Sequence, residues 1–505
     1  MAMMTGNLVT TLHDLATQNG WLNRQAFAVH SATRTFETCT YADVFAQAGA
    51  AAAALTRHGA GPGDRVLIAL PDGLDFVRAF LGTLHAGAVA IPVNPMLPGK
   101  DLAVLLDSAA PAVAVGGPAL ARAAGGRWRV LAPADLAGGL APPVEARGPD
   151  DDAFAQFTSG TTGHPKLVFH SHADPVVHDQ AFGKPVLGLR PGTVTLSVSK
   201  SFFSYGLGNS VFFPMFSGAT AVLEPGQPTE DVILAVIEAR EVDVLFAVPS
   251  VYARLLAHPA VAGLRRLRIA FCATEALPAV VEAGITALGG PVLLNGYGST
   301  EAGSTYVSNA LGASRTGTVG KVMPPYRVKV TDEAGRELPP GAEGRLAVQG
   351  PTMSAPAATL AGRPPRDPAR WHPTGDVAVI DPGGFIRIAG RSDDLEIVGG
   401  VNVHPAEVED ALRNLPQVTD VAVCAVPDAR GVSRLVAYVV PEPGGPGEDA
   451  GKRLIGRLRG TVSAHKVPSD VVFVTGLPRT PTGKLRRRAL REAGAAYELT
   501  GRWPT

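Results

Sequence analysis

Residues 157–166, Phe-Thr-Ser-Gly-Thr-Thr-Gly-His-Pro-Lys, combine hydroxyls, glycines and a cation in the way that an anion-binding loop requires. Glycine lets backbone N–H groups approach a polyanion because it lacks a Cβ atom, and the hydroxyls and Lys166 add donors and positive charge. The segment does not match the P-loop pattern, because Pro165 separates Gly163 from Lys166 and no Gly-Lys-Ser/Thr triplet opens a helix. Taken alone, the segment is compatible with a phosphate cradle and equally with a flexible surface turn.

Three further segments place carboxylates beside small residues. They are residues 295–301 (Asn-Gly-Tyr-Gly-Ser-Thr-Glu), 371–376 (Trp-His-Pro-Thr-Gly-Asp) and 390–394 (Gly-Arg-Ser-Asp-Asp), and all are expected to form turns. The first follows the apolar run 292–294, at the carboxyl end of a strand, where open α/β sheets bind ligands. Glu301 suits Mg²⁺, which uses one or two carboxylates together with phosphate oxygens and waters. Asp376 can accept hydrogen bonds from ribose hydroxyls, with Arg391 beside the same ring.

A loop near the C-terminus, residues 477–484 (Leu-Pro-Arg-Thr-Pro-Thr-Gly-Lys), presents Lys484. Each of these segments also has an ordinary structural interpretation: a strand-ending turn, a helix N-cap, an exposed ion pair or a solvated lysine. Their order and combination along the chain must therefore decide between the two interpretations.

The expected elements around these segments form an α/β fold. A helix over residues 73–85 lies between the apolar runs 65–70 and 88–93, and such a strand–helix–strand unit indicates a parallel sheet covered by helices. A preceding helix covers residues 41–59, and apolar runs continue at 112–115, 193–198, 219–223 and 242–248. The sequence therefore predicts a large domain of layered α/β sheets.

The pattern of apolar and polar residues changes after residue 317, where short alternating segments predict a β-rich subdomain. These segments are residues 326–330, 344–348, 377–380 and 385–389. A helix at 405–412 and strands at 421–426 and 435–440 then predict a compact α+β module. We expect a large N-terminal domain, residues 1–390, and a small mobile C-terminal domain, residues 391–505.

Composition excludes several classes of partner for this chain of 505 residues. Lys plus Arg and Asp plus Glu both number 45, and the net charge of zero argues against nucleic acid or an anionic membrane as a bulk electrostatic partner. The three cysteines, Cys39, Cys272 and Cys424, are too widely spaced to indicate a zinc site or a disulfide framework. No signal peptide and no apolar run of about 20 residues is apparent, so we expect a soluble, cytoplasmic protein.

The ordered motifs T-S-G-T-T-G-x-P-K, Y-G-S-T-E, T-G-D, G-R-x-D-D and P-x-T-x-x-G-K resemble those of the adenylate-forming (ANL) superfamily. This superfamily includes acyl-CoA synthetases, peptide-synthetase adenylation domains and firefly luciferase, and the resemblance runs over essentially the whole chain. It implies two half-reactions. A carboxylic acid attacks the α-phosphate of Mg-ATP to give acyl-adenylate and pyrophosphate, and a thiol, in acyl-CoA synthetases that of coenzyme A, then displaces AMP.

The resemblance also implies roles for individual residues. The β- and γ-phosphates would be held by Thr158, Ser159, Gly160, Thr161, Thr162, Gly163 and Lys166. Thr300 would contact the α-phosphate and Glu301 the Mg²⁺ ion, while Asp376 and Arg391 would bind ribose. Asn295 and Tyr297 would flank adenine, and the nucleotide-binding set is completed by Gly296, Gly298, Thr274 and Glu275.

The small domain carries three further expectations from the same family. Lys484 is similar to the lysine that bridges carboxylate and α-phosphate, so the expected catalytic residues are Lys484, Thr300 and Glu301. Asp393 matches the hinge about which the small domain rotates between half-reactions. Gly399 and Gly400 would line the pantetheine tunnel, because a thin arm passes close to backbone that lacks Cβ atoms.

The segment that lines the acyl pocket in this family, residues 201–210, contains no acidic residue. An α-amino acid is disfavoured because burying its ammonium without a partner costs several kcal/mol. This segment and residues 170–175 resemble the benzoate–CoA ligase branch, which implies an aryl or alicyclic acid, with a polycyclic acid left open. The expected pocket residues are Phe203, Tyr205, Gly206, Asn209, Phe246, Val248, Ala273, Gly296 and Gly303.

Two departures from the family pattern bear on function. Thr274 stands where relatives usually have glycine, and Glu396 and Ile397 replace an apolar residue and a lysine beside the pantetheine route. The favoured interpretation is an acid–CoA ligase that uses ATP and Mg²⁺. The alternatives are an adenylation enzyme that delivers the acyl group to a carrier protein or partner enzyme, and a non-catalytic nucleotide-binding paralogue. A homodimer is left open.

Overall fold

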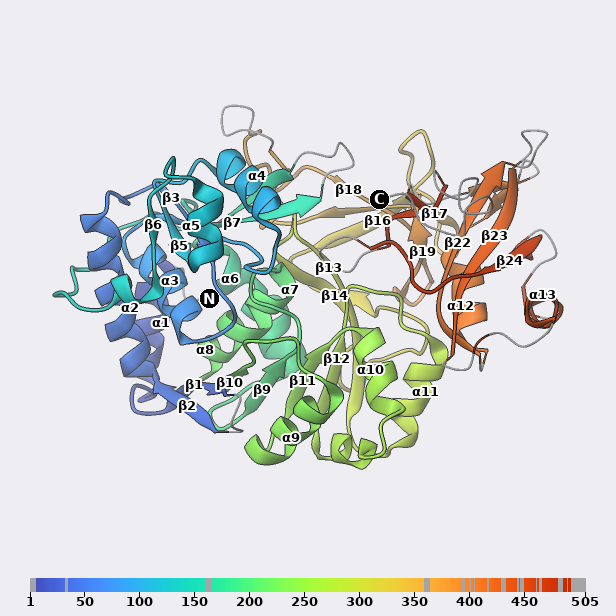
Figure 1. The fold of residues 1–505 in the computed structure, drawn as a ribbon, viewed down its shortest axis with the longest axis horizontal. Helices are drawn as coiled ribbons and strands as arrows, with labels where there is room; N and C mark the ends of the chain where they lie inside the picture. Colours follow the sequence, from blue (N-terminus) through green and yellow to red (C-terminus); the bar gives the residue numbers. More distant parts are fainter. Residues whose placement is uncertain are drawn as a thin grey trace.

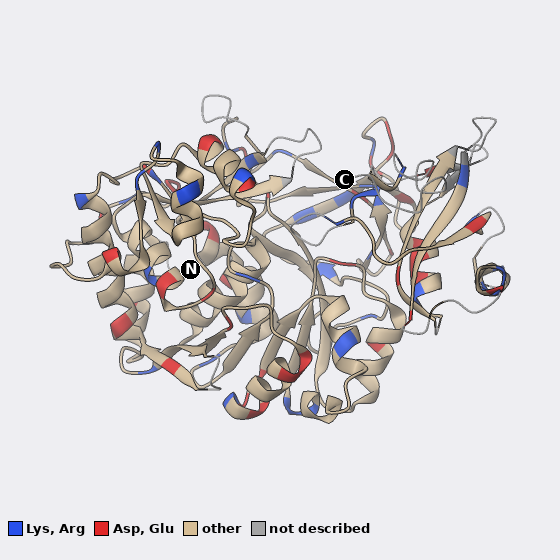
Figure 2. Ribbon diagram, in the orientation of Figure 1, with Lys and Arg blue, Asp and Glu red and all other residues tan. Residues whose placement is uncertain are grey.

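The computed structural model describes most of the chain. The described residues are 6–31, 35–159, 165–357, 364–392, 396–398, 401–403, 405–415, 417–427, 433–442, 445, 449–459, 461–462, 466–479, 485–487 and 489–491. Among them, no helix is both long and apolar enough to cross a bilayer. Figure 2 shows Lys and Arg interspersed with Asp and Glu over the described elements, in agreement with the net charge of zero.

The first sheet has six strands in the order β6-β5-β3-β4-β7-β8. They are β3 (Arg65–Ala69), β4 (Val89–Pro92), β5 (Val113–Gly116), β6 (Val130–Leu131), β7 (Asp152–Ser159) and β8 (Pro165–Ser171). The associated helices are α1 (Leu8–Gln18), α2 (Tyr41–Arg57), α3 (Leu74–His85), α4 (Gly99–Ala109) and α5 (Pro118–Ala124). The expected strand–helix–strand unit is confirmed as β3–α3–β4, with β3 and β4 parallel. Helices on both faces explain why the inner strands β3, β4 and β5 are almost wholly apolar.

The second sheet has nine strands in the order β15-β14-β13-β12-β11-β9-β10-β1-β2, with a parallel centre from β13 to β1. The strands are β1 (Gln25–His30), β2 (Phe36–Thr40), β9 (Val194–Ser197), β10 (Thr220–Leu223), β11 (Val244–Ala247), β12 (Ile269–Cys272), β13 (Val292–Ser299), β14 (Ser304–Ser308) and β15 (Lys321–Val322). Helices α9 (Glu230–Arg240), α10 (Pro249–Leu256) and α11 (Ala279–Ala287) lie beside this sheet at the bottom of Figure 1.

Short helical segments complete the two layers, and an apolar core is shared between the two sheets. The segments are α6 (Asp174–His178), α7 (Ser204–Leu207) and α8 (Phe213–Ser217), with the π-helical turns η2 (Asp179–Leu187) and η3 (Gly208–Phe212) and the 3₁₀ turns η1 (Pro133–Leu136) and η4 (Val261–Arg266). One cluster joins Phe80 and Phe154 from the first layer to Phe212 and to Phe27 of β1. The two sheets therefore form one packed body.

The structure corrects the expected turns at residues 295–298 and 372–376. Residues 295–299 continue β13, because the strand leaves the parallel sheet after Leu294 and pairs antiparallel with β14, Gly296 opposite Ser308. Residues 372–376 likewise lie within β18 (His372–Ile380). Neither segment alternates apolar and polar residues, so its sequence gives no strand signal. Each segment is a strand because neighbouring strands pair with it.

The predicted β-rich subdomain is confirmed as an antiparallel sheet in the order β16-β17-β18-β19. Its other strands are β16 (Arg327–Thr331), β17 (Glu343–Gln349) and β19 (Ile386–Arg391). The C-terminal elements are β20 (Glu396–Val398), β21 (Val401–Val403), α12 (Pro405–Arg413), β22 (Val418–Pro427), β23 (Ser433–Pro441), α13 (Ala450–Leu458) and β24 (Asp470–Phe473). They lie at one end of the molecule in Figure 1. The domain boundary at residue 390 stays a prediction.

Candidate active site

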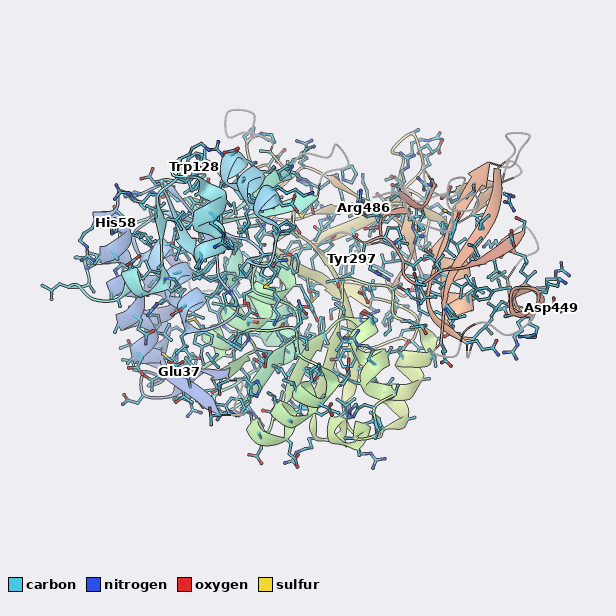
Figure 3. All side chains as sticks on the ribbon, viewed as in Figure 1. Glu37, His58, Trp128, Tyr297, Asp449 and Arg486 are labelled. Atoms are coloured by element: carbon cyan, nitrogen blue, oxygen red, sulfur yellow. The ribbon has the colours of Figure 1, made fainter. Side chains whose placement is uncertain are left out.

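Three residues of the predicted nucleotide site meet where β13, β18 and β19 come together. The Tyr297 hydroxyl donates a hydrogen bond to Oδ2 of Asp376. Arg391 Nη1 lies 3.3 Å from Oδ1 of the same carboxylate and donates to the Thr374 carbonyl at 3.0 Å. Asp376 and Arg391 are cross-strand partners in the β18–β19 ladder. Figure 3 shows Tyr297 near the centre of the molecule, between the large sheet and the C-terminal elements.

Backbone geometry supports this cluster. Gly375 has φ of +77°, a conformation that favours glycine, and a Cβ atom there would lie 2.7 Å from Nη2 of Arg391 and would displace the guanidinium from its place beside Asp376. Burial, with the neighbouring Tyr306 and the Asp376 charge, raises the pKa of Tyr297 well above its ordinary value. The phenol therefore stays protonated at neutral pH and remains the donor to the nearly buried carboxylate.

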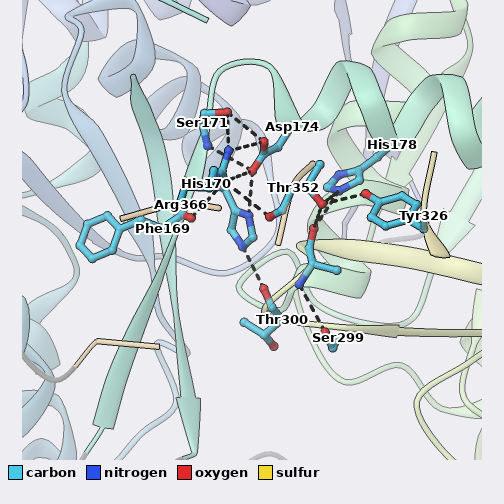
Figure 4. A network of polar contacts seen from close by, with 11 residues as sticks. Phe169, His170, Ser171, Asp174, His178, Ser299, Thr300, Tyr326, Thr352 and Arg366 are labelled. Carbon is cyan, nitrogen blue, oxygen red and sulfur yellow. Dashed lines mark hydrogen bonds and ion pairs between the residues drawn. The ribbon is translucent and has the colours of Figure 1, made fainter. Parts of the chain in front are cut away.

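Thr300 and Glu301 lie in the turn between β13 and β14, and their backbone is held from behind. The Thr300 carbonyl accepts from His170 Nε2 at 2.9 Å (Figure 4). The Glu301 carbonyl accepts from the Ser354 amide at 2.8 Å. Neither the Thr300 hydroxyl nor the Glu301 carboxylate hydrogen-bonds to any other residue that the structure describes. Both side chains are half-buried and remain available to a ligand.

The donor set around Glu301 suits Mg²⁺ rather than a caged metal. No cluster of three or more His, Cys, Asp or Glu side chains occurs in the described part of the chain. Mg²⁺ is commonly bound by one or two carboxylates together with substrate phosphates and waters, so a single free carboxylate beside a phosphate site fits this ion.

The flanks of the hydroxyl-rich segment, residues 157–166, belong to a β-hairpin. Thr158 pairs with Lys166 and Ser159 with Pro165 in the antiparallel β7–β8 ladder. The sequence of this segment is also compatible with a surface turn. In the structure its two flanks are strands, because β7 and β8 pair directly with each other. Gly160, Thr161, Thr162 and Gly163, at the predicted phosphate contact, lie outside the described residues.

Three of the remaining nucleotide residues are engaged in local contacts. Asn295 is buried, and its Nδ2 donates to the Thr318 carbonyl at 3.4 Å. Glu275 accepts from the amide and the hydroxyl of Ser250, at 3.2 and 3.3 Å, in the first turn of α10. A Cβ atom on Gly298 would lie 2.4 Å from the Ser304 carbonyl, so the close β13–β14 pairing requires this glycine. Their roles toward adenine stay predictions.

Three of the predicted acyl-pocket residues, Tyr205, Phe246 and Gly296, lie around Phe271 of β12. The Phe246 ring centroid lies 5.9 Å from that of Phe271, and the Tyr205 centroid lies 6.2 Å away. A Cβ atom on Gly296 would lie 2.6 Å from Phe271 Cζ. Phe246 and Ala273 are buried, whereas Phe203 and Val248 are half-buried. The sequence-based set omitted Phe271, although its position opposite Phe246 on the adjacent strand follows from the parallel pairing.

The other small and polar pocket residues are tightly placed. A Cβ atom on Gly206 would lie 2.0 Å from the Lys200 carbonyl. Asn209 is buried, and its Nδ2 has no hydrogen-bond partner among the described residues. Gly303 has φ of +83° and leaves space that His170 fills, 2.8 Å from a Cβ atom built there. The structure thus explains this glycine by the close histidine, and its contact with substrate stays a prediction.

A cavity of about 730 Å³ lies away from these residues, at the carboxyl ends of β3 and β5. Its lining includes Asp72, Arg78 and Gly117. None of the predicted site residues lines it, so cavity volume does not mark the candidate site.

Two family models match this chain, and together they cover most of it. Residues 17–355 match the AMP-binding enzyme family, and residues 407–484 match the AMP-binding enzyme C-terminal domain. The chain belongs to the AMP-binding enzyme family. The predicted resemblance to adenylate-forming enzymes is therefore confirmed, as is the α/β fold with a large and a small C-terminal part.

Relatives of this AMP-binding enzyme act on aromatic acids by name. The chain is 38% identical over 499 residues to p-hydroxybenzoic acid–AMP ligase FadD22 of Mycobacterium tuberculosis, covering 97% of this chain and 69% of that one. It is 36% identical over 470 residues to benzoate–CoA ligase of Thauera aromatica, covering 87% of each. The crystal structure of anthranilate CoA ligase AuaEII with anthranoyl-AMP superposes with a TM-score of 0.90 at 28% identity, covering 97% and 98%.

The two departures from the family pattern have structural explanations. Thr274 has φ of +75°, a left-handed conformation that glycine adopts without strain, so threonine is the strained choice at this position. Glu396 is buried, and Arg491 Nε donates to its Oε1 at 2.8 Å, so its charge is compensated within the C-terminal elements. Ile397 lies beside it in β20.

The small-domain predictions fall mainly on residues that the structure does not describe. Lys484, Asp393, Gly399 and Gly400 all lie outside the described residues. Leu485, next to Lys484, forms an isolated antiparallel bridge with Arg479. The roles of these four residues stay predictions.

Sequence reasoning missed a buried polar group behind the Thr300 turn. His170, Asp174 and Arg366 form its centre (Figure 4). The spacing of His170 and Asp174 at i and i+4 after an apolar strand was a usable signal. Arg366 offered none, because it is 192 residues away from Asp174 in sequence.

Proposed function

We propose that the protein is an ATP-dependent ligase that activates a benzoate-type aryl acid as its acyl-adenylate, releases pyrophosphate, and transfers the acyl group to coenzyme A with release of AMP. The observation that carries this proposal is that the Tyr297–Asp376–Arg391 cluster and the Thr300–Glu301 turn lie at the two ends of the short segment 297–301, where β13 ends in the turn to β14. A ribose site and a phosphate site that lie so near to each other fit a single nucleotide. Membership of the AMP-binding enzyme family agrees with this assignment.

The chain's own residues supply positioning and charge for the first half-reaction. Asp376 accepts hydrogen bonds from the ribose hydroxyls, and Tyr297 and Arg391 fix the orientation of its carboxylate. The Thr300 hydroxyl donates to the α-phosphate, and Glu301 holds Mg²⁺, which supplies neutralising charge when bound. Lys166 and Lys484 add positive charge at the phosphates. Such preorganised groups lower the barrier because charge develops where donors already lie.

The acyl pocket suits an uncharged ring. Residues 201–210 contain no acid to pair with an ammonium, and Tyr205, Phe246 and Phe271 provide aromatic surface. The buried Nδ2 of Asn209 is a donor without a partner among the described residues, which supports a contact with a polar atom of the bound acid. Relatives named for benzoate and p-hydroxybenzoate support the same class.

A second candidate acceptor is a carrier protein or another partner in place of coenzyme A. The relative at 38% identity is named as an acid–AMP ligase. This name mentions the acyl-adenylate and no transfer to coenzyme A. The compensated charge of Glu396 removes the electrostatic objection to coenzyme A that its sequence position raised. Coenzyme A therefore remains the first proposal.

The test is pyrophosphate release against a panel of benzoate, 4-hydroxybenzoate, anthranilate, an alicyclic acid and a polycyclic acid, with and without coenzyme A. We expect release that depends on an aryl acid, and an aroyl-CoA thioester when coenzyme A is present. Acid-dependent release without any thioester would support the carrier-protein candidate. Release with none of the acids would contradict the enzymatic proposal and favour a nucleotide-binding paralogue.

A further inference from the structure

A buried polar network lies directly behind the turn that carries Thr300 and Glu301 (Figure 4). His170, the penultimate residue of β8, is fully buried and stacks on Phe154 with ring centroids 5.0 Å apart. Its Nδ1 lies 3.1 Å from Oδ2 of Asp174, the first residue of α6. Asp174 also accepts from the amide and the hydroxyl of Ser171, at 3.2 and 2.8 Å. The network therefore fixes the end of β8 against the start of α6.

Three consecutive carbonyls of the turn are held from this side. His170 Nε2 bonds the Thr300 carbonyl at 2.9 Å, and the Ser354 amide bonds the Glu301 carbonyl at 2.8 Å. The Ala302 carbonyl accepts from His178 Nε2 at 2.9 Å and from the Thr352 hydroxyl at 2.7 Å. With the backbone fixed, the Thr300 and Glu301 side chains can point only away from the network.

Both ring nitrogens of His170 face acceptors. A backbone carbonyl and a carboxylate can only accept hydrogen bonds, so a ring that bonds both must carry a proton on each nitrogen. His170 is therefore an imidazolium in this geometry. Burial alone would raise the pKa of Asp174, but the His170 hydrogen bond and the Arg366 charge outweigh it and lower the pKa to about 2. The carboxylate stays ionised.

Arg366 completes the network from the segment that leads into β18. Its Nη1 and Nη2 bond Oδ1 and Oδ2 of Asp174 at 2.8 and 2.5 Å, a two-point contact with the whole carboxylate. Two cationic side chains thus contact the Asp174 carboxylate, and the acids Asp150 and Asp152 also act electrostatically on Arg366. His178 adds no charge at neutral pH, because burial lowers its pKa to about 4.

We propose that His170, Asp174 and Arg366 are positioning residues for adenylation: Arg366 and Asp174 fix the His170 ring, and its N–H on the Thr300 carbonyl holds the Thr300–Glu301 turn in its phosphate-binding form. This inference rests on the proposed function, because it assigns a purpose to the same turn. A protonated His170 ring on the Thr300 carbonyl also complements the polyphosphate that the turn is proposed to face. Gly303, whose Cβ would lie 2.8 Å from the His170 ring, permits the close approach.

Asp174→Asn is the decisive variant, and Asp179→Asn is its matched control. Both change a buried aspartate to its amide, but Asp179 lies in η2 with Lys184 as its ion-pair partner and forms no hydrogen bond to the turn in the part of the chain that the structure describes. We expect Asp174→Asn to lower kcat for pyrophosphate release about 10- to 100-fold and to raise the Mg²⁺ concentration needed for half-maximal rate. KM for the aryl acid should stay within about twofold. Partial loss of the fold would lower the apparent kcat but would not change the Mg²⁺ dependence of the folded fraction, so the raised Mg²⁺ requirement is the result that separates positioning from loss of the fold.

A second measurement does not depend on activity. With ¹⁵N-labelled histidine, the wild-type His170 ring should show protons on both nitrogens at neutral pH, and His170→Gln identifies its signals. Asp174→Asn should leave one ring nitrogen unprotonated, whereas Asp179→Asn should change nothing there. If Asp174→Asn does not fold, Arg366→Lys, which keeps the charge without the two-point contact, takes its place with an expected loss in kcat of about 3- to 10-fold.

Two results would overturn the inference: a singly protonated His170 in the wild type, or a kcat for Asp174→Asn within threefold of that for Asp179→Asn. Absence of acid-dependent pyrophosphate release in the wild type is a different result. It refutes the proposed function, and the His170 spectrum then tests the charged network independently.

Discussion

Removing one hydroxyl from Tyr297 should weaken ATP binding while leaving the acid site unchanged. The hydroxyl donates to Asp376, which is only 9% exposed and which we propose holds the ribose hydroxyls. A hydrogen bond to an ionised group contributes about 1.5–3 kcal/mol. Tyr297→Phe keeps the aromatic ring but leaves Arg391, 3.3 Å from the carboxylate, as the remaining charged partner of Asp376 from this cluster. A loss of about 1–2 kcal/mol in ATP binding corresponds to a rise in KM for ATP of about 5- to 30-fold.

Tyr306→Phe is the matched control for this variant. The Tyr306 ring packs edge-on against Tyr297 with centroids 5.6 Å apart, yet its buried hydroxyl has no hydrogen-bond partner among the described residues. Its removal should leave KM for ATP within about twofold of the wild type, since no bond is lost.

The assay is pyrophosphate release at saturating 4-hydroxybenzoate, with ATP and 2′-deoxy-ATP compared for each variant. If Asp376 reads the ribose, the wild type should prefer ATP, and Tyr297→Phe should reduce that preference because the carboxylate is no longer fixed. Equal KM values for ATP in the two tyrosine variants, or an undiminished preference in Tyr297→Phe, would refute the reasoning.

Three further predictions follow from separate parts of the molecule. Lys484→Ala should abolish most acid-dependent pyrophosphate release yet spare thiolation of supplied acyl-adenylate; equal loss in both steps would contradict its assigned role. Thr274→Gly should raise the free energy of unfolding by about 1 kcal/mol in urea denaturation, because the exposed threonine is held at φ of +75°. Burial raises the pKa of Asp179 to about 6 despite Lys184, so the folded state retains this proton above the ordinary value of 3.8. This proton contributes about 3 kcal/mol to the free energy of unfolding below pH 3.8, and the contribution is lost as the pH rises through about 6. Asp179→Asn should remove that part of the pH dependence, and an unchanged dependence of the unfolding free energy would contradict the assignment.

The sequence predicted the elements whose pattern is local. The unit β3–α3–β4 follows from apolar runs of strand length on either side of a helical period, because burial on both faces of a parallel sheet makes the strands uniformly apolar. Residues 295–299 were expected to form a turn, because their glycines and polar side chains carry no strand pattern. They form a strand because β14 supplies a partner.

Contacts between distant segments could not be predicted in the same way. Tyr297 and Asp376 are 79 residues apart and belong to different sheets, so no periodicity links the donor to its carboxylate. The sequence did identify both residues, through the family pattern, as parts of a nucleotide site. The hydrogen bond that makes one orient the other came only from the tertiary structure.

The sequence alone determined the family, the α/β class and the chemistry that the motifs imply, because these depend on residue types in a fixed order. The tertiary structure decided which groups act together. Asp174 is one acid among 45 acidic residues in the sequence, and only the fold places it between His170 and Arg366 behind the Thr300 carbonyl. The physical reason is that hydrogen bonds and ion pairs depend on distances of about 3 Å. Such distances between remote segments are set by the packing of the whole chain.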